Sequence, residues 1–306
     1  MKRVALSILL AVFVLLAAAL ILFGLRRVQT QRQVEAEGRS ALPAAPALAA
    51  TSRLQIIPLY EEASADSRWI SGHGVSYLIR TDTASILLDV GHNPDALAAA
   101  PFAQNMQALD VPWHALDAVV ISHPHPDHVG GTDAWWRHTI SFGELPGGVG
   151  AVPVYTPIPM AYSGGRYSAE PTLVAPDAAT TGVLSYPEVF PLSLFEAKGR
   201  EQALVVKVAG QGLVLITGCG HPGLEPLVTR AEALYGMPVV GVVGGLHYEN
   251  IAPEALNAHI QFLQSRSIRL AALSPHDSSA QAMDAFQAAF ADGYHTLRVG
   301  EAVQFP

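Results

Sequence analysis

One short segment constrains this chain more than any other: His123-Pro124-His125-Pro126-Asp127-His128, where four side chains that can bind a metal lie within six residues. It directly follows residues 117–122, whose apolar run predicts a buried strand. The two prolines and the glycine pair that follows at 130–131 disfavour a helix. We therefore expect a stiff loop at the end of a strand.

The spacing within this loop indicates a metal site. His123 and His125 are two positions apart in an extended chain, so both side chains can face one cation. Asp127 and His128 are adjacent and diverge, so they can serve a second position. Imidazole nitrogens with one carboxylate suit zinc, iron or manganese better than calcium or magnesium alone. The alternative is a polar surface loop, but this density of ligand side chains favours a metal.

Three later apolar runs also end in a turn of small residues that carries a histidine. The turns are Gly218-Cys219-Gly220-His221, Gly244-Gly245-Leu246-His247 and Ser274-Pro275-His276. Three strands that each deliver a histidine are what a site at one sheet edge requires. We expect His221 and His276 to be metal ligands, rather than histidines that cap a strand end or donate to a carbonyl. For His247, ligation, support of a ligand and substrate contact all stay open.

The order of these motifs resembles the metallo-β-lactamase superfamily, whose signature is His-x-His-x-Asp-His after a hydrophobic strand. His73-Gly74-Val75-Ser76 and residues 86–91 precede the signature, and Pro275-His276-Asp277-Ser278 closes the set. Within the superfamily the set is similar to the dihydropterin–aminobenzene-phosphate synthase-like proteins. The resemblance covers residues 54 to 306. It implies an α/β fold, a four-layer αβ/βα sandwich with metals at one sheet edge.

Two positions depart from the pattern that the resemblance implies. Cys219 stands where many superfamily members carry a metal-bridging Asp, so two metal positions could be unequally occupied. A thiolate binds zinc well, but a lone buried cysteine can equally be a small hydrophobic residue. The last motif continues as Asp277-Ser278-Ser279 where the branch usually has Cys-Thr-Gly, so the branch's substrate does not carry over. Asp277 could orient a histidine.

The expected site follows from these motifs and the resemblance. Zinc is the expected cofactor, as one or two ions, with Mn²⁺ or Fe²⁺ as alternatives, and the candidate ligands are His123, His125, Asp127, His128, Cys219, His221 and His276. A metal lowers the pKa of bound water from 15.7 to roughly 7. Asp127 and His247 are the candidate catalytic residues, and Asp127 would orient the water and pass a proton to the leaving group. His73 is expected at the site edge. The remaining histidines are expected to be structural or on the surface: His92, His114, His138, His259 and His295.

This site predicts a metal-dependent hydrolase acting on an ester, lactone or phosphoester of a small molecule. One alternative is a dihydropterin-type synthase or transferase. Another is a non-catalytic, metal-stabilised ligand-binding domain, which would not need Asp127. A β-lactamase proper fits poorly with Cys219 and with the motif at 244–247.

The start of the chain predicts a membrane segment. Val4 to Leu25 are 22 residues without charge or proline, enough to span a bilayer as a helix. A cleaved signal peptide is the alternative, although its apolar core is normally roughly 7–15 residues long. Basic residues flank both ends, so the positive-inside rule hardly decides the orientation. Lys2, Arg3 and the free amine favour an N-terminus inside, which places the domain in the periplasm or outside the cytoplasm.

Three segments are expected: an anchor or signal peptide over 1–25, an Ala/Pro-rich linker over 26–51, and a catalytic domain over 52–306. The linker reads as a semi-extended tether whose first half could extend the anchor helix. The chain is half hydrophobic, which suffices for one sizeable core, and its net charge of −8 argues against a nucleic-acid partner. One cysteine permits no intramolecular disulfide.

Hydrophobic periodicity supports a mixed α and β domain. Helices are expected at 94–109, with Asn93 as cap, and at 224–235, 253–265 and 280–290. Strands are expected at 54–59, 75–79, 86–90, 117–122, 152–155, 204–208, 213–217, 239–243, 270–273, 297–299 and 302–305. Residues 141–200 show no regular pattern, and such long segments usually form lids or binding loops.

Overall fold

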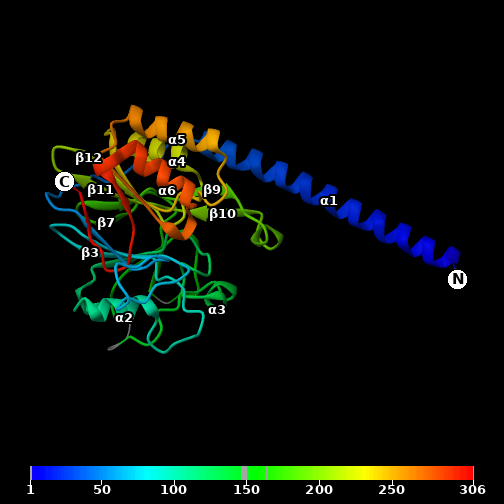
Figure 1. Cartoon of the computed structure of the whole chain (residues 1–306), viewed down its shortest axis with the longest axis horizontal. Helices are drawn as coiled ribbons and strands as arrows, with labels where there is room; N and C mark the ends of the chain where they lie inside the picture. The colour runs from blue at the N-terminus through cyan, green and yellow to red at the C-terminus, as the bar shows by residue number, and fades with distance from the viewer. Residues whose placement is uncertain (1, 146–149, 163, 306) are drawn as a thin grey trace. The chain divides into compact units, whose positions relative to one another are not determined.

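Strands from the first half of the chain, drawn in blue to green in Figure 1, form a seven-stranded mixed sheet together with β16 from the C-terminal end. Its strand order is β16-β1-β2-β3-β4-β5-β6. β1 pairs with β16 and β2 in the antiparallel sense, as does β2 with β3, whereas β3 to β6 run parallel. The strands are β1 (Gln55–Tyr60), β2 (Ser76–Arg80), β3 (Ser85–Leu88), β4 (Ala118–Val120), β5 (Val154–Thr156), β6 (Gly165–Tyr167) and β16 (Val303–Gln304).

The second half forms another seven-stranded sheet, in the order β15-β14-β13-β12-β11-β8-β7. β12 to β15 run parallel, and right after β12, β13 and β14 the chain enters helices, which is the βαβ arrangement of a parallel sheet. The strands are β7 (Leu173–Ala175), β8 (Ala178–Thr180), β11 (Leu204–Val208), β12 (Gly212–Ile216), β13 (Val239–Gly244), β14 (Leu270–Leu273) and β15 (Tyr294–Thr296). The helices are α4 (Leu224–Tyr235), α5 (Pro253–Ser265) and α6 (Ala280–Phe290).

Three hydrophobic clusters define the layers. The first lies between the sheets and joins residues such as Tyr77 and Ile86 to Val206 and Val214. The second packs α4, α5 and α6 on the outer face of the second sheet. The third packs the outer face of the first sheet against α2 (Pro101–Ala108), α3 (Thr132–Trp136) and the turn η1 (Trp113–Ala115). The layers are therefore helix, sheet, sheet, helix, and the α/β fold expected from the resemblance is confirmed.

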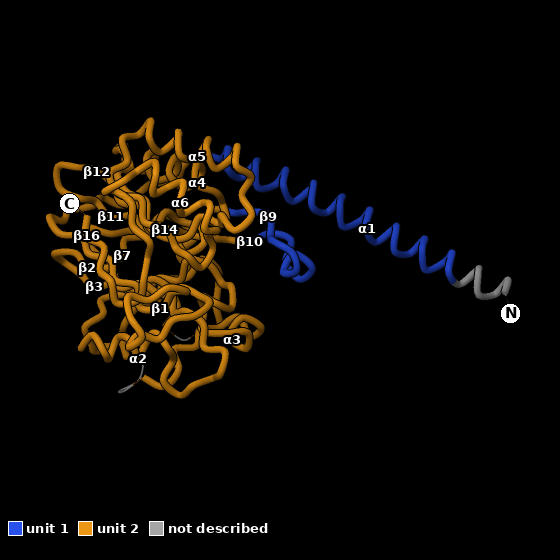
Figure 2. Tube along the Cα trace, in the orientation of Figure 1, with its two compact units in different colours: residues 1–41, 185–199 blue, residues 42–184, 200–306 orange. Residues whose placement is uncertain are grey.

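The computed structural model describes residues 2–145, 150–162 and 164–305, with side chains from Leu9 onward in the first helix. Contacts divide the chain into two units, residues 1–41 with 185–199 and residues 42–184 with 200–306 (Figure 2). Both sheets and their helices belong to the larger unit. The smaller one contains α1 (Lys2–Gly38) and a hairpin between β9 (Leu184–Pro187) and β10 (Lys198–Glu201), with the turn η2 (Leu192–Leu194) near its tip.

α1 contains one stretch, Leu9–Gly38, that is long and apolar enough to cross a membrane by length and composition, and none of its most apolar window is buried. The helix ends at Gly38 rather than at Leu25, so it continues through the first half of the segment expected as a linker, which is the alternative that the sequence left open. The larger unit begins at Leu42, because Leu48 is buried and Ala49 N–H donates to the carbonyl of Pro176.

Two other expectations need correction. The helix expected at 94–109 covers only Pro101–Ala108, because Pro101 begins it and the Asn93 side chain instead closes a turn with Leu97 N–H and C=O. The strand expected at 297–299 lies at Tyr294–Thr296. Residues 141–200, which showed no pattern, contain several strands of three or four residues, too short to show a period.

Candidate metal centre

The candidate ligands follow strands of both sheets at the carboxyl ends of parallel strands. The loop after β4 carries His123, His125, Asp127 and His128, and the turn after β12 carries Cys219 and His221. The turn η3 (Pro275–Asp277) after β14 carries His276. Parallel strands end at one edge of a sheet, and the structure brings all seven of these residues together there.

A first group consists of His123, His125 and His221. The ring centroids of His123 and His125 are 4.5 Å apart, and each lies 4.8 Å from the ring of His221. Ligand atoms of His123, His221 and Cys219 lie within 4.8 Å of one another. His123 is fully buried and His125 nearly so, so the three rings are held by packing.

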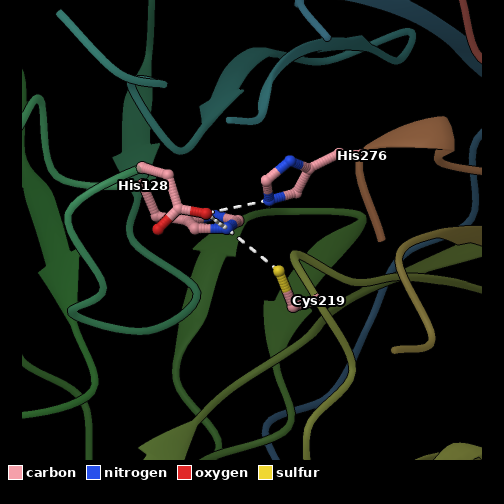
Figure 3. A group of neighbouring side chains, drawn as sticks. His128, Cys219 and His276 are labelled. Atoms are coloured by element: carbon pink, nitrogen blue, oxygen red, sulfur yellow. Dashed lines mark hydrogen bonds and ion pairs between the residues drawn. The ribbon is translucent and has the colours of Figure 1, made fainter. Parts of the chain in front are cut away.

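A second group consists of Asp127, His128, Cys219 and His276, whose ligand atoms also lie within 4.8 Å of one another (Figure 3). His276 Nε2 is 2.8 Å from Asp127 Oδ2, and His128 Nε2 is 3.1 Å from Cys219 Sγ. Cys219 belongs to both sets of ligand atoms. It therefore stands between the groups, at the position where the resemblance expects a bridging carboxylate.

The residues of both groups fit a transition metal. Nitrogen, sulfur and one carboxylate oxygen are the donors that such metals prefer. The buried Nε2 of His123 has no hydrogen-bond partner among the residues that the structure describes, and a buried polar atom is costly without one. Burial and the neighbouring histidines lower the pKa of His123 and of His221 well below the usual range. Both rings are thus neutral, which is the form that binds a metal.

The second group favours positive charge. Burial would raise the pKa of Asp127, but His128 and His276 hold it well below its ordinary value. Burial likewise opposes charging of His276, yet hydrogen bonds and charges from Asp127 and Cys219 raise its pKa to about 11. A carboxylate and a sulfur atom in a buried site therefore stabilise a cation at this position.

A buried carboxylate that the sequence did not assign orients His128. Asp89 follows β3, is fully buried, and accepts hydrogen bonds from Ser122 N–H at 2.7 Å and Ser122 O–H at 2.6 Å. It also lies 2.7 Å from His128 Nδ1. This contact turns His128 Nε2 toward the second group.

Two further buried carboxylates hold the other ligand turns. Glu201 accepts from the backbone N–H groups of Gly220 and His221, both at 2.8 Å, and burial raises its pKa to about 7. Glu61 accepts from the backbone N–H of His276 at 3.0 Å and from the Ser274 hydroxyl at 2.7 Å. Each ligand-bearing segment is thus tied to an acidic residue far away in the sequence. Asp89 interrupts an apolar run of the sequence, whereas Glu61 follows such a run and Glu201 lies in the polar strand β10.

His247 and Asp277 lie beside the first group. The His247 ring centroid is 4.6 Å from that of His221, and its side chain is 40% exposed, so it faces solvent more than the ligand histidines do. A supporting role toward a histidine was one option that the sequence left open for Asp277. Its Oδ2 accepts from the backbone N–H of His247 at 2.9 Å, and burial raises its pKa to about 8.

The edge of the second group contains His73 and His92. The His73 ring lies 4.2 Å from that of His276 and its Nδ1 is 2.9 Å from Glu62, as expected of a residue at the site edge. His92 was expected to be structural or on the surface; burial lowers its pKa, and the charges of Asp127, His73 and His276 act on it. His259 agrees with the expectation of a structural or surface histidine, since its Nδ1 is hydrogen-bonded to the Tyr248 hydroxyl at 2.8 Å.

Comparisons with known sequences agree with this geometry. A family model described as the metallo-β-lactamase superfamily matches residues 70–140, which include the His123–His128 loop. The 7,8-dihydropterin-6-methyl-4-(β-D-ribofuranosyl)-aminobenzene-5′-phosphate synthase of Methanocaldococcus jannaschii is similar over 286 residues at 23% identity. The match covers 82% of this chain and 97% of that relative.

Solved structures share the fold. Tm1679, a metal-dependent hydrolase of the β-lactamase superfamily, superposes with a TM-score of 0.60 at 19% identity, over 82% of this chain and 99% of its own. The metallo-β-lactamase fold protein YhfI from Bacillus subtilis gives a TM-score of 0.52 at 13% identity, over 83% of this chain and 100% of its own.

Proposed function

Because the chain belongs to the metallo-β-lactamase superfamily, we propose that it is a metal-dependent hydrolase that cleaves an ester, lactone or phosphoester bond in a small molecule. One observation supports this most strongly: two sets of ligand atoms meet at Cys219, and Asp127 belongs to one of them. In a structural metal site four protein ligands fill the coordination shell. Such a site does not require a carboxylate like Asp127 next to a second metal position.

Zinc is the proposed metal. His123, His125 and His221 would hold one ion and Asp127, His128 and His276 another, with Cys219 between them. A bound zinc ion supplies a Lewis acid that lowers the pKa of water and polarises the bond to be cut. Asp89, Glu201 and Glu61 fix the ligand segments, so the histidine rings need not reorganise during turnover.

Asp127 and His247 are the proposed catalytic residues. The Asp127 side chain is 16% exposed, so it is reachable from solvent while its Oδ2 is bonded to His276. That carboxylate would orient the attacking water and carry a proton to the leaving group. His247 would contact the substrate, since it lies at the exposed side of the first group.

A dihydropterin-type synthase or transferase is the second candidate. The observation in its favour is the match to the M. jannaschii synthase over 97% of that protein's length. The two reactions differ in their products, because hydrolysis places one oxygen atom from water in the product and group transfer does not. Turnover in ¹⁸O-labelled water followed by mass spectrometry distinguishes them.

The test of the proposed activity uses the full chain on a panel of esters, lactones and phosphoesters. We expect turnover that a chelator abolishes and zinc restores. Asp127→Asn should lose about 10²–10⁴-fold, the usual contribution of a general acid–base group. Asp133→Asn is the matched control, because that side chain is 80% exposed on α3. Absence of turnover from fully metal-loaded protein would instead support a non-catalytic binding domain.

We also propose that α1 anchors the protein in a membrane, with the larger unit outside the cytoplasm. The support is its apolar, unburied stretch. The side chains of Lys2 and Arg3, on which the expected orientation depends, lie outside the described residues. The protein should sediment with membranes and resist extraction by high salt, which removes only electrostatic attachment. A fully active mature form without residues 1–25 would favour a cleaved signal peptide.

A further inference from the structure

The hairpin of the smaller unit exposes large apolar side chains at its tip. Phe190, Leu194 and Phe195 are 69%, 53% and 55% exposed. They lie within six residues of chain: Leu194 is the last residue of the turn η2, and Phe190 and Phe195 lie on either side of that turn. Single exposed hydrophobic residues are ordinary, but a cluster of this kind marks a contact surface.

The hairpin lies along α1, and the contacts give its direction. Near its base, Lys198 forms an ion pair with Glu37, one residue before the end of α1. Toward its tip, residues of the hairpin and the helix line one small gap: Pro187, Glu188, Ser193 and Ala197 on one side, and Phe23, Arg26, Arg27 and Thr30 on the other. The tip therefore points toward the apolar part of α1 (Figure 2).

Because of this direction, the tip of the hairpin lies beside the end of the apolar part of α1. Residues 4–25 form the apolar part of α1, and at 1.5 Å per residue they extend about 33 Å, close to the thickness of a bilayer core. The gap shared with the hairpin begins at Phe23, where this part ends. The apolar tip thus lies where a membrane spanned by α1 would have its surface.

The backbone of the tip is suited to an apolar environment. Ser193 N–H donates to Val189 C=O, and Leu194 N–H donates to Pro191 C=O. The N–H groups of Phe195 and Glu196 both donate to Leu192 C=O. Backbone groups that are already bonded remove the main cost of leaving water.

Charged side chains near the tip of the hairpin favour its placement at the membrane surface rather than in the membrane interior. Arg26 and Arg27 line the gap with the hairpin, and cationic side chains there attract anionic lipid headgroups. Glu196 is exposed beside the tip and must stay in water, which limits the depth of insertion. The pattern of aromatic and aliphatic side chains next to two arginines is typical of an interfacial contact.

We propose that residues 190–195 insert into the interfacial layer of the bilayer that α1 spans, as a second, shallow attachment. The occupant of the apolar tip is lipid, because the tip continues an apolar helix surface that is itself unburied. The inference rests on the proposed anchoring by α1, and it adds a membrane contact that the sequence of the hairpin alone did not suggest.

The test uses the full chain in vesicles of phosphatidylcholine and phosphatidylglycerol, with single spin labels at cysteines introduced as Phe190→Cys or Phe195→Cys. Leu16→Cys reports the middle of α1, and Asp133→Cys reports an exposed position of the larger unit. The unsubstituted chain gives the background from Cys219. Electron paramagnetic resonance measures access of oxygen, which is enriched in lipid, against a water-soluble nickel chelate.

We expect Leu16 to be deep in lipid, and Phe190 and Phe195 to show a higher ratio of oxygen to nickel access than Asp133. A deep label at Leu16 with tip labels as accessible to nickel as Asp133 would overturn the hairpin contact and leave the anchor intact. A water-exposed label at Leu16 would overturn both. Tip labels shielded from both reagents and close to a second copy in dipolar measurements would assign the surface to self-association instead.

Discussion

Replacing Asp89 by asparagine should weaken metal binding by moving the proton of one histidine. With a metal on Nε2 of His128, the proton of that ring must be on Nδ1, which lies 2.7 Å from Asp89 Oδ2. An asparagine at position 89 offers one oxygen and one NH₂ group. Its oxygen must keep the backbone N–H of Ser122, now 2.7 Å from Asp89 Oδ1, because the reverse orientation would set two donors against each other.

The NH₂ group of the variant then faces His128 Nδ1 and donates to it. The imidazole proton moves to Nε2, the atom that points at Cys219 and Asp127. Loss of such a supporting partner usually lowers metal affinity about 10–100-fold. That range corresponds to about 1.4–2.7 kcal/mol of binding free energy.

The assay is competition for zinc between the full chain and a chelating dye, in detergent. Asp177→Asn is the matched control, because Asp177 is also fully buried but lies in the turn between β7 and β8, bonded to the Thr81 hydroxyl. We expect Asp89→Asn to lose affinity at one of its metal positions and Asp177→Asn to lose none. Native affinity in Asp89→Asn, or an equal loss in both variants, would refute the tautomer argument.

Three further outcomes follow from the described contacts. Glu201→Ala leaves the buried N–H of Gly220 and the half-buried N–H of His221 without their acceptor. It should lower the free energy of unfolding by about 1–3 kcal/mol for the Gly220 group alone in denaturant titrations. Glu201→Gln keeps one acceptor oxygen and should lose less; equal losses would contradict this. The Cys219 thiol should be alkylated slowly in zinc-loaded protein and faster after chelation, and equal rates would assign it to packing alone. A chain that starts at residue 42 should be more stable than one that starts at residue 52, because it retains buried Leu48, worth about 1.5–3 kcal/mol, and the backbone bonds of Thr51 with Lys207 and Ala209; identical melting would show that these contacts are not needed.

Much of the fold could be predicted because local signals mark the elements. α4, α5 and α6 have the bounds that the sequence predicts, since Gly236 ends α4 in the left-handed conformation, Pro253 begins α5, and the Ser279 side chain caps α6. The helix expected at 94–109 was too long because apolar periodicity continued across Pro101, which in fact begins the helix. Strands of three residues leave no period to detect, so β6, β7 and β8 were missed.

Some residues of the candidate site could be predicted from local sequence, and others could not. The spacing of His123, His125, Asp127 and His128 is local, and the sequence alone indicated it. The roles of Asp89, Glu61 and Glu201 depend on chain closure over long distances: the bond from His276 N–H to Glu61 joins residues 215 positions apart. Periodicity carries no information on such pairs. The place of Cys219 between two ligand groups is likewise a result of three strands ending together.

The metal content of the purified chain shows whether the His123–His128 loop binds a metal. Native protein, His125→Ala and the control His114→Ala, whose side chain is exposed, are compared by elemental mass spectrometry. We expect one to two equivalents of transition metal in the native chain and in His114→Ala, and loss of most of it in His125→Ala. That variant should also melt earlier, since metal binding stabilises the folded state. Metal content in His125→Ala equal to that of the native chain would contradict the assignment of this cluster as a metal centre.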